Sequence, residues 1–191
     1  MLMPLCDIKM IMNNISSNNK QPIIGIFDSG LGGLTILNQL NNDFKNYKFI
    51  YFGDTAHLPY GTKSNQSIIK FCEQIVEFLI SKGATIIIVA CHSASAVAIN
   101  HLKMKYAIPI IDVIQPSIVS GLKTTKTNSL CVLGTATTIK SKTYSEHIDK
   151  LSNHVNIHEI ACPLFVPIVE EGLENSSIAS LAAEMYLNSL N

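Results

Sequence analysis

Short apolar runs alternate with longer amphipathic segments along most of this chain. The runs are rich in β-branched and aromatic residues and have the length of strands, whereas the segments between them repeat their apolar residues at helical spacing. The predicted strands are 22–27, 48–53, 84–90, 108–112, 129–133 and 155–161. The predicted helices are 33–41, 64–82, 93–105, 116–123, 137–151 and a final helix from about 176 to the end.

This alternation predicts an α/β fold built from βαβ units. The run at 84–90, ATIIIVA, is continuously apolar, as expected for a parallel strand that helices cover on both faces. The pattern weakens around 112–116, which predicts a boundary between a first domain at 22–113 and a second at 114–191. The polar, turn-rich stretch before them is interpreted as a disordered extension over 1–21.

Composition narrows the classes of function. The 191 residues carry a formal net charge of zero, so a basic surface for nucleic acid is not expected. The sequence shows neither a basic leader nor a long uncharged apolar run, so we expect no secretory signal and no membrane span. Its five cysteines are widely spaced, without a CxxC or zinc-ligand pattern. They favour a reduced, cytoplasmic location and give no metal site.

Polar side chains follow the predicted strands at the points where parallel strands end. These residues are Asp28-Ser29, Asp54-Thr55, Cys91-His92-Ser93, Asp112, Gly134-Thr135 and Cys162. Ligands of open parallel sheets bind beyond the carboxyl ends of the strands. The arrangement therefore predicts a pocket for a small polar ligand.

The glycine-rich loop DSGLGG at 28–33 could hold a phosphate group or an amine. It lacks the full G-x-G-x-x-G spacing, and Asp28 at its start would repel phosphate. Asp28 and Ser29 suit an ammonium group and a hydrogen-bonding substrate better. A turn whose glycines serve backbone geometry alone is the alternative interpretation.

Cys91 follows the most apolar strand and precedes a helix, with Ser93 placed as its N-cap. The backbone N–H groups and macrodipole at a helix N-terminus stabilise a thiolate and lower the pKa of a thiol. A reactive thiol and an inert core cysteine are both open interpretations of this position.

Five motifs occur in order, and they are IGIFDSGLGGLTIL, YFGDTAHLPYG, VACHSASAVA, GTATT and ACPLFVPIVEEG. Together they resemble the glutamate racemase family, collinearly from about Pro22 to the end of the chain. The resemblance implies two flavodoxin-like, doubly wound parallel-sheet domains that face each other across a cleft, the second of them incomplete. It also implies cofactor-independent interconversion of L- and D-glutamate, which supplies D-glutamate for peptidoglycan, and a homodimer.

Carried over by position, the resemblance makes Cys91 the first catalytic cysteine, which exchanges a proton with one face of the substrate Cα. The implied substrate-binding residues are Asp28, Ser29, Tyr60, Gly61, His92, Ser93, Thr135, Thr138 and Glu170. Cys162 lies in the ACP motif and is interpreted as structural. Racemisation needs a base on one face of Cα and an acid on the other, and two thiols of similar pKa can provide them without a metal or cofactor.

The sequence departs from the family at two points. His92 and Ser93 stand where the family has Asn-Thr, and His92 is bulkier than Asn and titrates near neutral pH. The family's second catalytic cysteine lies in a GCTH motif, which does not occur before Asn191. We therefore expect the 191-residue chain alone to be poorly active or inactive.

Three other interpretations stay open. Aspartate racemases share the fold and the chemistry, although the PYG loop and the ACPLFVPIVEEG segment favour the glutamate branch. A degenerate, inactive racemase that acts as a binding or regulatory module is favoured by His92 and by the missing strand. A generic flavodoxin-like binding protein explains the fold but not Cys91 with its collinear partners.

Overall fold

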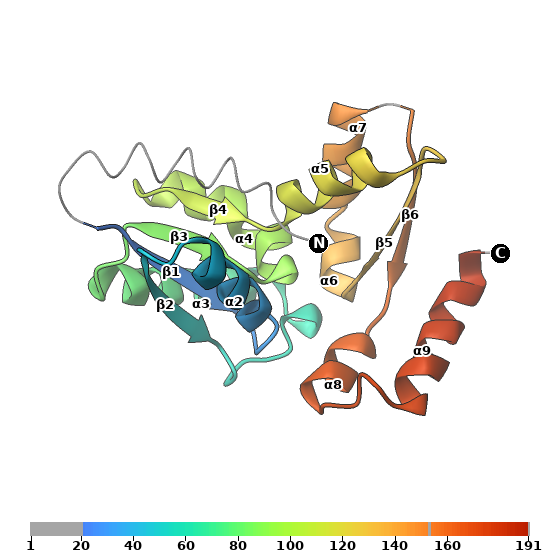
Figure 1. Ribbon diagram of the computed structural model, residues 1–191, viewed down its shortest axis with the longest axis horizontal. Helices are drawn as coiled ribbons and strands as arrows, with labels where there is room; N and C mark the ends of the chain where they lie inside the picture. The colour runs from blue at the N-terminus through green and yellow to red at the C-terminus, as the bar shows by residue number, and fades with distance from the viewer. Residues whose placement is uncertain (1–20, 153, 191) are drawn as a thin grey trace.

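The structure is a computed structural model that describes residues 21–152 and 154–190. The extension predicted over 1–21 lies, apart from Gln21, outside the described residues. The strands form two parallel sheets, and helices pack on them (Figure 1). The predicted α/β class is therefore confirmed.

The first sheet contains β1 (Ile23–Asp28), β2 (Lys48–Gly53), β3 (Ile86–Val89) and β4 (Ile110–Asp112) in the order β2-β1-β3-β4. All neighbouring strands are parallel, and β1 pairs with β3 in a register that sets Phe27 opposite Val89. The residues that end β1 and β3 therefore emerge side by side at one edge of the sheet.

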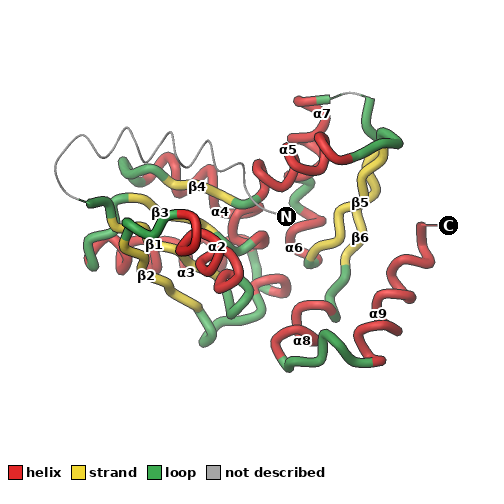
Figure 2. Tube along the Cα trace, viewed as in Figure 1, coloured by secondary structure: helices red, strands yellow, loops and turns green. Residues whose placement is uncertain are grey.

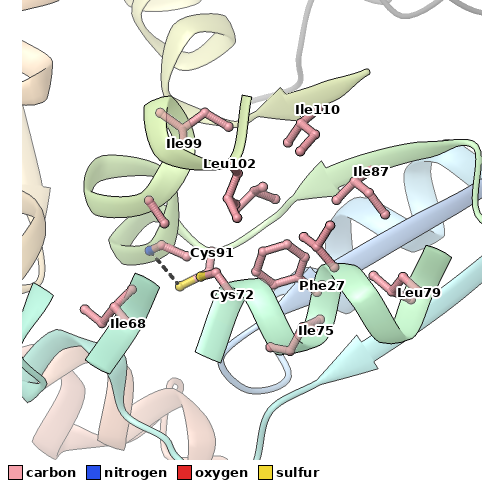
Figure 3. Packing of buried hydrophobic residues seen from close by; sticks show 14 of the residues in the cluster. Phe27, Ile68, Cys72, Ile75, Leu79, Ile87, Cys91, Ile99, Leu102 and Ile110 are labelled. Carbon is pink, nitrogen blue, oxygen red and sulfur yellow. Dashed lines mark hydrogen bonds between the residues drawn. The ribbon is translucent and has the colours of Figure 1, made fainter. Parts of the chain in front are cut away.

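Helices cover both faces of this sheet because successive side chains of its strands point to opposite faces. Ile24 and Ile26 of β1 pack with α2 (Gly33–Asp43) on one face. Phe27 packs on the other face with apolar residues of α3 (Asn65–Ser81) and α4 (His92–Lys105). Figure 3 shows this second cluster, with Cys91 and Cys72 next to each other at one end.

The second sheet contains β5 (Ser129–Gly134) and β6 (Asn156–Ala161), again parallel. One face of it packs against α5 (Ile114–Thr124) and α7 (Thr143–Leu151). The short helix α6 (Ala136–Lys140) lies between the two sheets, near the 3-10 helix η2 (Tyr60–Thr62). The chain continues through α8 (Phe165–Glu170), α9 (Ser177–Leu187) and the 3-10 helix η3 (Asn188–Leu190).

Two predicted helices were wrong in detail. The helix predicted over 137–151 is α6 and α7, separated by a turn in which Lys142 has a left-handed backbone with φ of 58°. The final helix begins as predicted but ends at Leu187, and α8 was not predicted at all. Figure 2 shows α8 and α9 together at the outer end of the molecule.

Among the described residues, no helix has the length and apolar character that crossing a membrane requires.

Candidate active site

A cleft of about 750 Å³ lies between the two sheets, and side chains from both line it. All ten residues that the sequence marked as catalytic or substrate-binding are among its lining. From the first sheet and its helices come Asp28, Ser29, Tyr60, Gly61, Cys91, His92 and Ser93. From the elements around the second sheet come Thr135, Thr138 and Glu170. The cleft thus brings together residues that are far apart in sequence.

Cys91 is the N-cap of α4 and lines this cleft at the end of β3, although it is also packed in the apolar cluster of the first sheet. The Sγ accepts a hydrogen bond from the backbone N–H of Ala94 at 3.5 Å, drawn as the dashed line in Figure 3. The thiol also contacts the Ser29 hydroxyl at 3.4 Å. The sequence had placed Ser93 at the N-cap, so this detail was wrong. The cysteine itself takes the capping position and points its sulfur at the helix amides.

The pKa of Cys91 is raised above its ordinary value, which overturns the expectation that the helix N-terminus would lower it. Burial is the largest cause, because only 5% of the residue is exposed, and the negative charge of Asp28 is the second. The hydrogen bonds with Ser29 and with backbone amides act in the opposite direction but are outweighed. In the free protein the group is therefore a thiol at neutral pH.

Asp28 ends β1 beside Cys91 and organises the DSGLGG loop. Its Oδ2 accepts hydrogen bonds from the backbone N–H of Gly30 at 3.1 Å and of Gly33 at 3.2 Å. A side chain at residue 33 would collide with Asp28, since an added Cβ would lie 2.7 Å from the Asp28 Cβ. The glycine-rich loop thus folds around a carboxylate at the edge of the cleft and not around a phosphate.

Tyr60 lies almost fully buried at the start of η2, and its hydroxyl is already engaged. It donates a hydrogen bond of 2.6 Å to Asp54, whose carboxylate also contacts the Nδ1 of His57 at 2.8 Å. Burial, followed by this hydrogen bond, raises the pKa of Tyr60 well above its ordinary value. Sequence reasoning noted Asp54 only as a polar residue at a strand end. Its role in holding the PYG loop can be recognised only from the folded structure.

Gly61 joins the first sheet's loops to α6. A Cβ added at this glycine would lie 2.7 Å from the Cβ of Thr135, so the two backbones approach closely here. The Thr137 hydroxyl donates to the carbonyl of Gly61 at 2.9 Å. This hydrogen bond joins α6 to η2.

A chain of hydroxyl groups crosses from α4 to α6. The Ser93 Oγ lies 2.8 Å from the Thr135 Oγ1, which in turn lies 3.1 Å from the Thr138 Oγ1. Thr135 is also the N-cap of α6, because its Oγ1 accepts from the backbone N–H of Thr138 at 3.2 Å. Hydroxyl groups can donate to or accept from a bound ligand, so this row suits a carboxylate.

His92 is the first residue of α4, and its ring stacks near that of Tyr144 on α7. The ring centroids are 6.4 Å apart and the planes are 14° from parallel. The side chain of His92 is exposed; desolvation by the neighbouring protein lowers its pKa, and the negative charges of Asp28 and Asp112 act in the opposite direction. Tyr144 was not identified from the sequence, since its place on the cleft depends on the packing of α7.

Glu170 ends α8 and lies directly against Gly30, where its carboxylate occupies the space that a side chain at residue 30 would need. Burial raises the pKa of Glu170, and the charges of Asp28 and Glu171 raise it further.

Cys162 also lines the cleft and is buried, with its thiol directed at the carbonyl of Ile160. Over residues 21–152 and 154–190, no group of three His, Cys, Asp or Glu residues is arranged to hold a metal ion.

Residues 24–185 match the sequence model of the Asp/Glu/Hydantoin racemase family. The chain belongs to this family. A glutamate racemase from Aquifex aeolicus (strain VF5) is 40% identical over 164 residues, which cover 86% of this chain and 64% of that relative. One from Persephonella marina is 42% identical and is likewise covered to 64%. The chain thus spans somewhat less than two thirds of the length of these racemases.

Solved structures agree with this assignment. A glutamate racemase from Bacillus anthracis superposes with a TM-score of 0.86 at 32% identity, covering 90% of this chain and 64% of that one. A glutamate racemase from Francisella tularensis in complex with D-glutamate superposes with a TM-score of 0.82 at 40% identity, with the same coverage of both chains. The racemase fold is therefore shown, and the resemblance to the family read from the five motifs is confirmed.

Proposed function

We propose that this chain supplies Cys91 and most of the substrate cleft of a glutamate racemase that interconverts L- and D-glutamate without a cofactor. The observation that carries the proposal is the position of the Cys91 thiol, which caps α4 inside a cleft that also holds Asp28 and Ser29. The names of the relatives, which are glutamate racemases, support glutamate over aspartate as the substrate.

In the proposed reaction the Cys91 thiolate removes the proton from Cα of the bound amino acid. The C–H electron pair stays on the substrate as a carbanion, whose negative charge hydrogen-bond donors around the carboxylate would stabilise. Asp28 is suited to bind the substrate ammonium group. That pairing would offset the negative charge that raises the pKa of Cys91, so substrate binding itself would help to form the thiolate.

Inversion requires a proton donor on the opposite face of Cα. We propose a second thiol for this role, which the family carries in its GCTH motif and which the printed sequence does not contain. Cys162 lines the cleft but remains a structural residue in this proposal, because its thiol is directed at the Ile160 carbonyl. The same proposal assigns the product, D-glutamate, to peptidoglycan synthesis and the protein to the cytoplasm as a homodimer.

Hydrogen exchange at Cα tests the role of Cys91 independently of inversion. The chain is incubated with D- or L-glutamate in deuterated water, and incorporation of deuterium at Cα is followed by NMR. We expect exchange from one enantiomer, which a Cys91→Ser variant loses and a Cys131→Ser variant keeps, since Cys131 is exposed on β5. Equal exchange by the wild type and by Cys91→Ser would contradict the proposed catalysis.

The raised pKa of Cys91 favours a second candidate, a racemase-like module that binds glutamate without turning it over. A thiol that stays protonated in the complex cannot act as the base. Calorimetry separates the two candidates when it is combined with the exchange assay. Tight binding without exchange over the neutral pH range supports the binding module, whereas exchange that depends on Cys91 supports the enzyme.

A further inference from the structure

Tyr51 lies behind the DSGLGG loop and is not among the residues that line the cleft. It is on β2, paired with Ile26 of β1, and packs in the apolar cluster that α2 covers. From there its hydroxyl donates a hydrogen bond of 3.0 Å to the backbone carbonyl of Gly30. The proposed reaction does not use this side chain, although its hydroxyl reaches the loop that carries Asp28 and Ser29.

Gly30 is held at both of its backbone groups. Its N–H donates to the Asp28 carboxylate at 3.1 Å, and its carbonyl accepts from Tyr51. Ser29 stands between Asp28 and Gly30 in the chain, and its hydroxyl lies 3.4 Å from the Cys91 sulfur. The position of the Ser29 hydroxyl therefore depends on where Gly30 is fixed.

The ring of Tyr51 has little room to move. A Cβ added at Gly33 would lie 3.1 Å from the Cε2 of this ring, and one added at Gly53 would lie 3.3 Å from its Cε1. Backbone that carries no side chain thus borders the ring at two of its edges and limits the directions of its hydroxyl. Burial raises the pKa of Tyr51, and the charge of Asp28 raises it further, so the hydroxyl remains a hydrogen-bond donor at neutral pH.

We infer that Tyr51 is a positioning residue, which through Gly30 holds the Ser29 hydroxyl against the Cys91 sulfur. The inference rests on the proposed function, because that function assigns to Cys91 the removal of the Cα proton. Hydrogen bonds from Ser29 lower the pKa of Cys91, so a displaced Ser29 makes the thiolate harder to form. A displacement of about 1 Å in a catalytic site can lower turnover by about a hundredfold.

Asp28 should stay in place when the Tyr51 hydroxyl is removed. The backbone N–H of Gly33 also donates to its Oδ2, at 3.2 Å, and this contact does not involve Tyr51. The site proposed for the substrate ammonium group should therefore persist while the activation of the thiol is impaired. For this reason the effect on turnover should exceed the effect on KM.

Alkylation of Cys91 in the free protein tests the inference without substrate. Tyr51→Phe removes the hydroxyl alone, and we expect iodoacetamide to modify Cys91 about fivefold more slowly at pH 8, since one neutral hydrogen bond is lost. A loop that had only become loose would expose the sulfur and speed its alkylation. Cys72, which is fully buried, should stay unmodified and so report that the variant is folded.

Tyr106→Phe is the matched control. The Tyr106 hydroxyl also donates to a backbone carbonyl, that of Glu73 on α3, at 3.3 Å, and neither residue lines the cleft. The alkylation rate of Cys91 in this variant should equal that of the wild type. An equal loss of rate in Tyr51→Phe and Tyr106→Phe would overturn the inference, because it would trace the effect to general destabilisation.

A double-mutant cycle shows whether Tyr51 acts through Ser29. Tyr51→Phe combined with Ser29→Ala should be alkylated within about twofold of the rate of Ser29→Ala alone, because the hydroxyl that Tyr51 positions is already absent. Multiplication of the two single effects would show that Tyr51 acts independently of Ser29. That result overturns the inference, as does an unchanged or faster rate in Tyr51→Phe.

Deuterium exchange at Cα separates the inference from the function on which it rests. With the enantiomer that the wild type exchanges, we expect Tyr51→Phe to lower the rate at saturation about fivefold and to change KM by less than about twofold. A change confined to KM overturns the positioning role and leaves the proposed catalysis standing. Absence of exchange in the wild type contradicts the proposed function, and the alkylation cycle then still decides whether Tyr51 positions Ser29.

Discussion

The sulfur of Cys91 and the hydroxyl oxygen of Ser29 lie 3.4 Å apart at the ends of the two central strands of the first sheet. In the thiol form Cys91 donates to Ser29, and in the thiolate form the hydroxyl can turn and donate to the sulfur. The second arrangement is the stronger one, because hydrogen bonds to an ionised acceptor are stronger than those between neutral groups. Ser29 therefore opposes the burial and the Asp28 charge that keep the thiol protonated.

Replacement of this hydroxyl should make Cys91 harder to ionise. In Ser29→Ala, we expect the pKa of Cys91 to rise further and its alkylation at pH 8 to slow by about tenfold, since a hydrogen bond to a charged group contributes about 1.5 kcal/mol. Mass spectrometry of iodoacetamide-treated protein measures the rate. The exposed Cys131 in the same sample is the internal control. An unchanged rate at Cys91 would show that Ser29 does not stabilise the thiolate.

Removal of the charge at Asp28 should have the opposite effect on the same thiol. Asn keeps an oxygen that can accept from the amides of Gly30 and Gly33, so the loop should persist in Asp28→Asn. Without the negative charge the pKa of Cys91 should fall, and alkylation at pH 8 should be about threefold faster. Glutamate binding should weaken at the same time because the ammonium group loses its partner. Faster alkylation with unchanged glutamate affinity would argue against Asp28 as the ammonium site.

Gly61 should tolerate no side chain, because η2 and α6 meet there without space for a methyl group. In Gly61→Ala the new Cβ would lie 2.7 Å from the Thr135 Cβ, and we expect a loss of about 1–3 kcal/mol in the free energy of unfolding. Urea denaturation followed by circular dichroism measures the loss. The matched variant is Gly121→Ala, where the nearest atoms are 3.4 Å away within a helix and no loss is expected. Equal stability of both variants would contradict the close approach.

Glu170 should make the fold more stable when it carries a proton. Its pKa is raised in the folded protein, so its charged form destabilises the fold at pH values above that pKa, and the penalty disappears below the pKa of the unfolded chain. We expect Glu170→Gln to raise the urea midpoint by about 0.3 M at pH 8 and to leave it unchanged at pH 4. Glu184→Gln, on the exposed side of α9, should change neither midpoint. A larger gain at pH 4 than at pH 8 would refute the assignment.

The sequence was sufficient to predict the strands of the first sheet and ten of the residues that line the cleft. The strand at 48–53 was predicted to the residue, because its apolar run is bounded by polar residues and a glycine. The helix over 137–151 was predicted as continuous because nothing local signals its interruption. The break falls at Ser141 and Lys142, without Gly or Pro, and a lysine with φ of 58° is uncommon. The ion pair of Lys142 with Glu159 on β6 and the hydrogen bond from the Thr143 hydroxyl to the Ala96 carbonyl on α4 hold that turn.

The ionisation of the site could not be predicted from the sequence. Local sequence places Cys91 at a helix N-terminus, which favours the thiolate, and this led to the wrong expectation for its pKa. The opposing influences are burial and the charge of Asp28, which lies 63 positions earlier in the chain. Likewise, the hydrogen bond between Tyr60 and Asp54 and the stacking of Tyr144 on His92 depend on how separate elements pack.

The pairing of Phe27 with Val89 fixes more than the shape of the first sheet. A one-residue slip of β1 against β3 would shift Asp28 by about 3.3 Å relative to Cys91. It would also move every side chain of β1 to the other face of the sheet. Insertions or deletions within 23–28 or 86–90 should therefore abolish the site even where the chain still folds. The connections at 44–47 and 106–109 precede β2 and β4, so they lie at the amino ends of the strands, away from the cleft. Changes of length in these connections should leave the Cys91 thiol in its place.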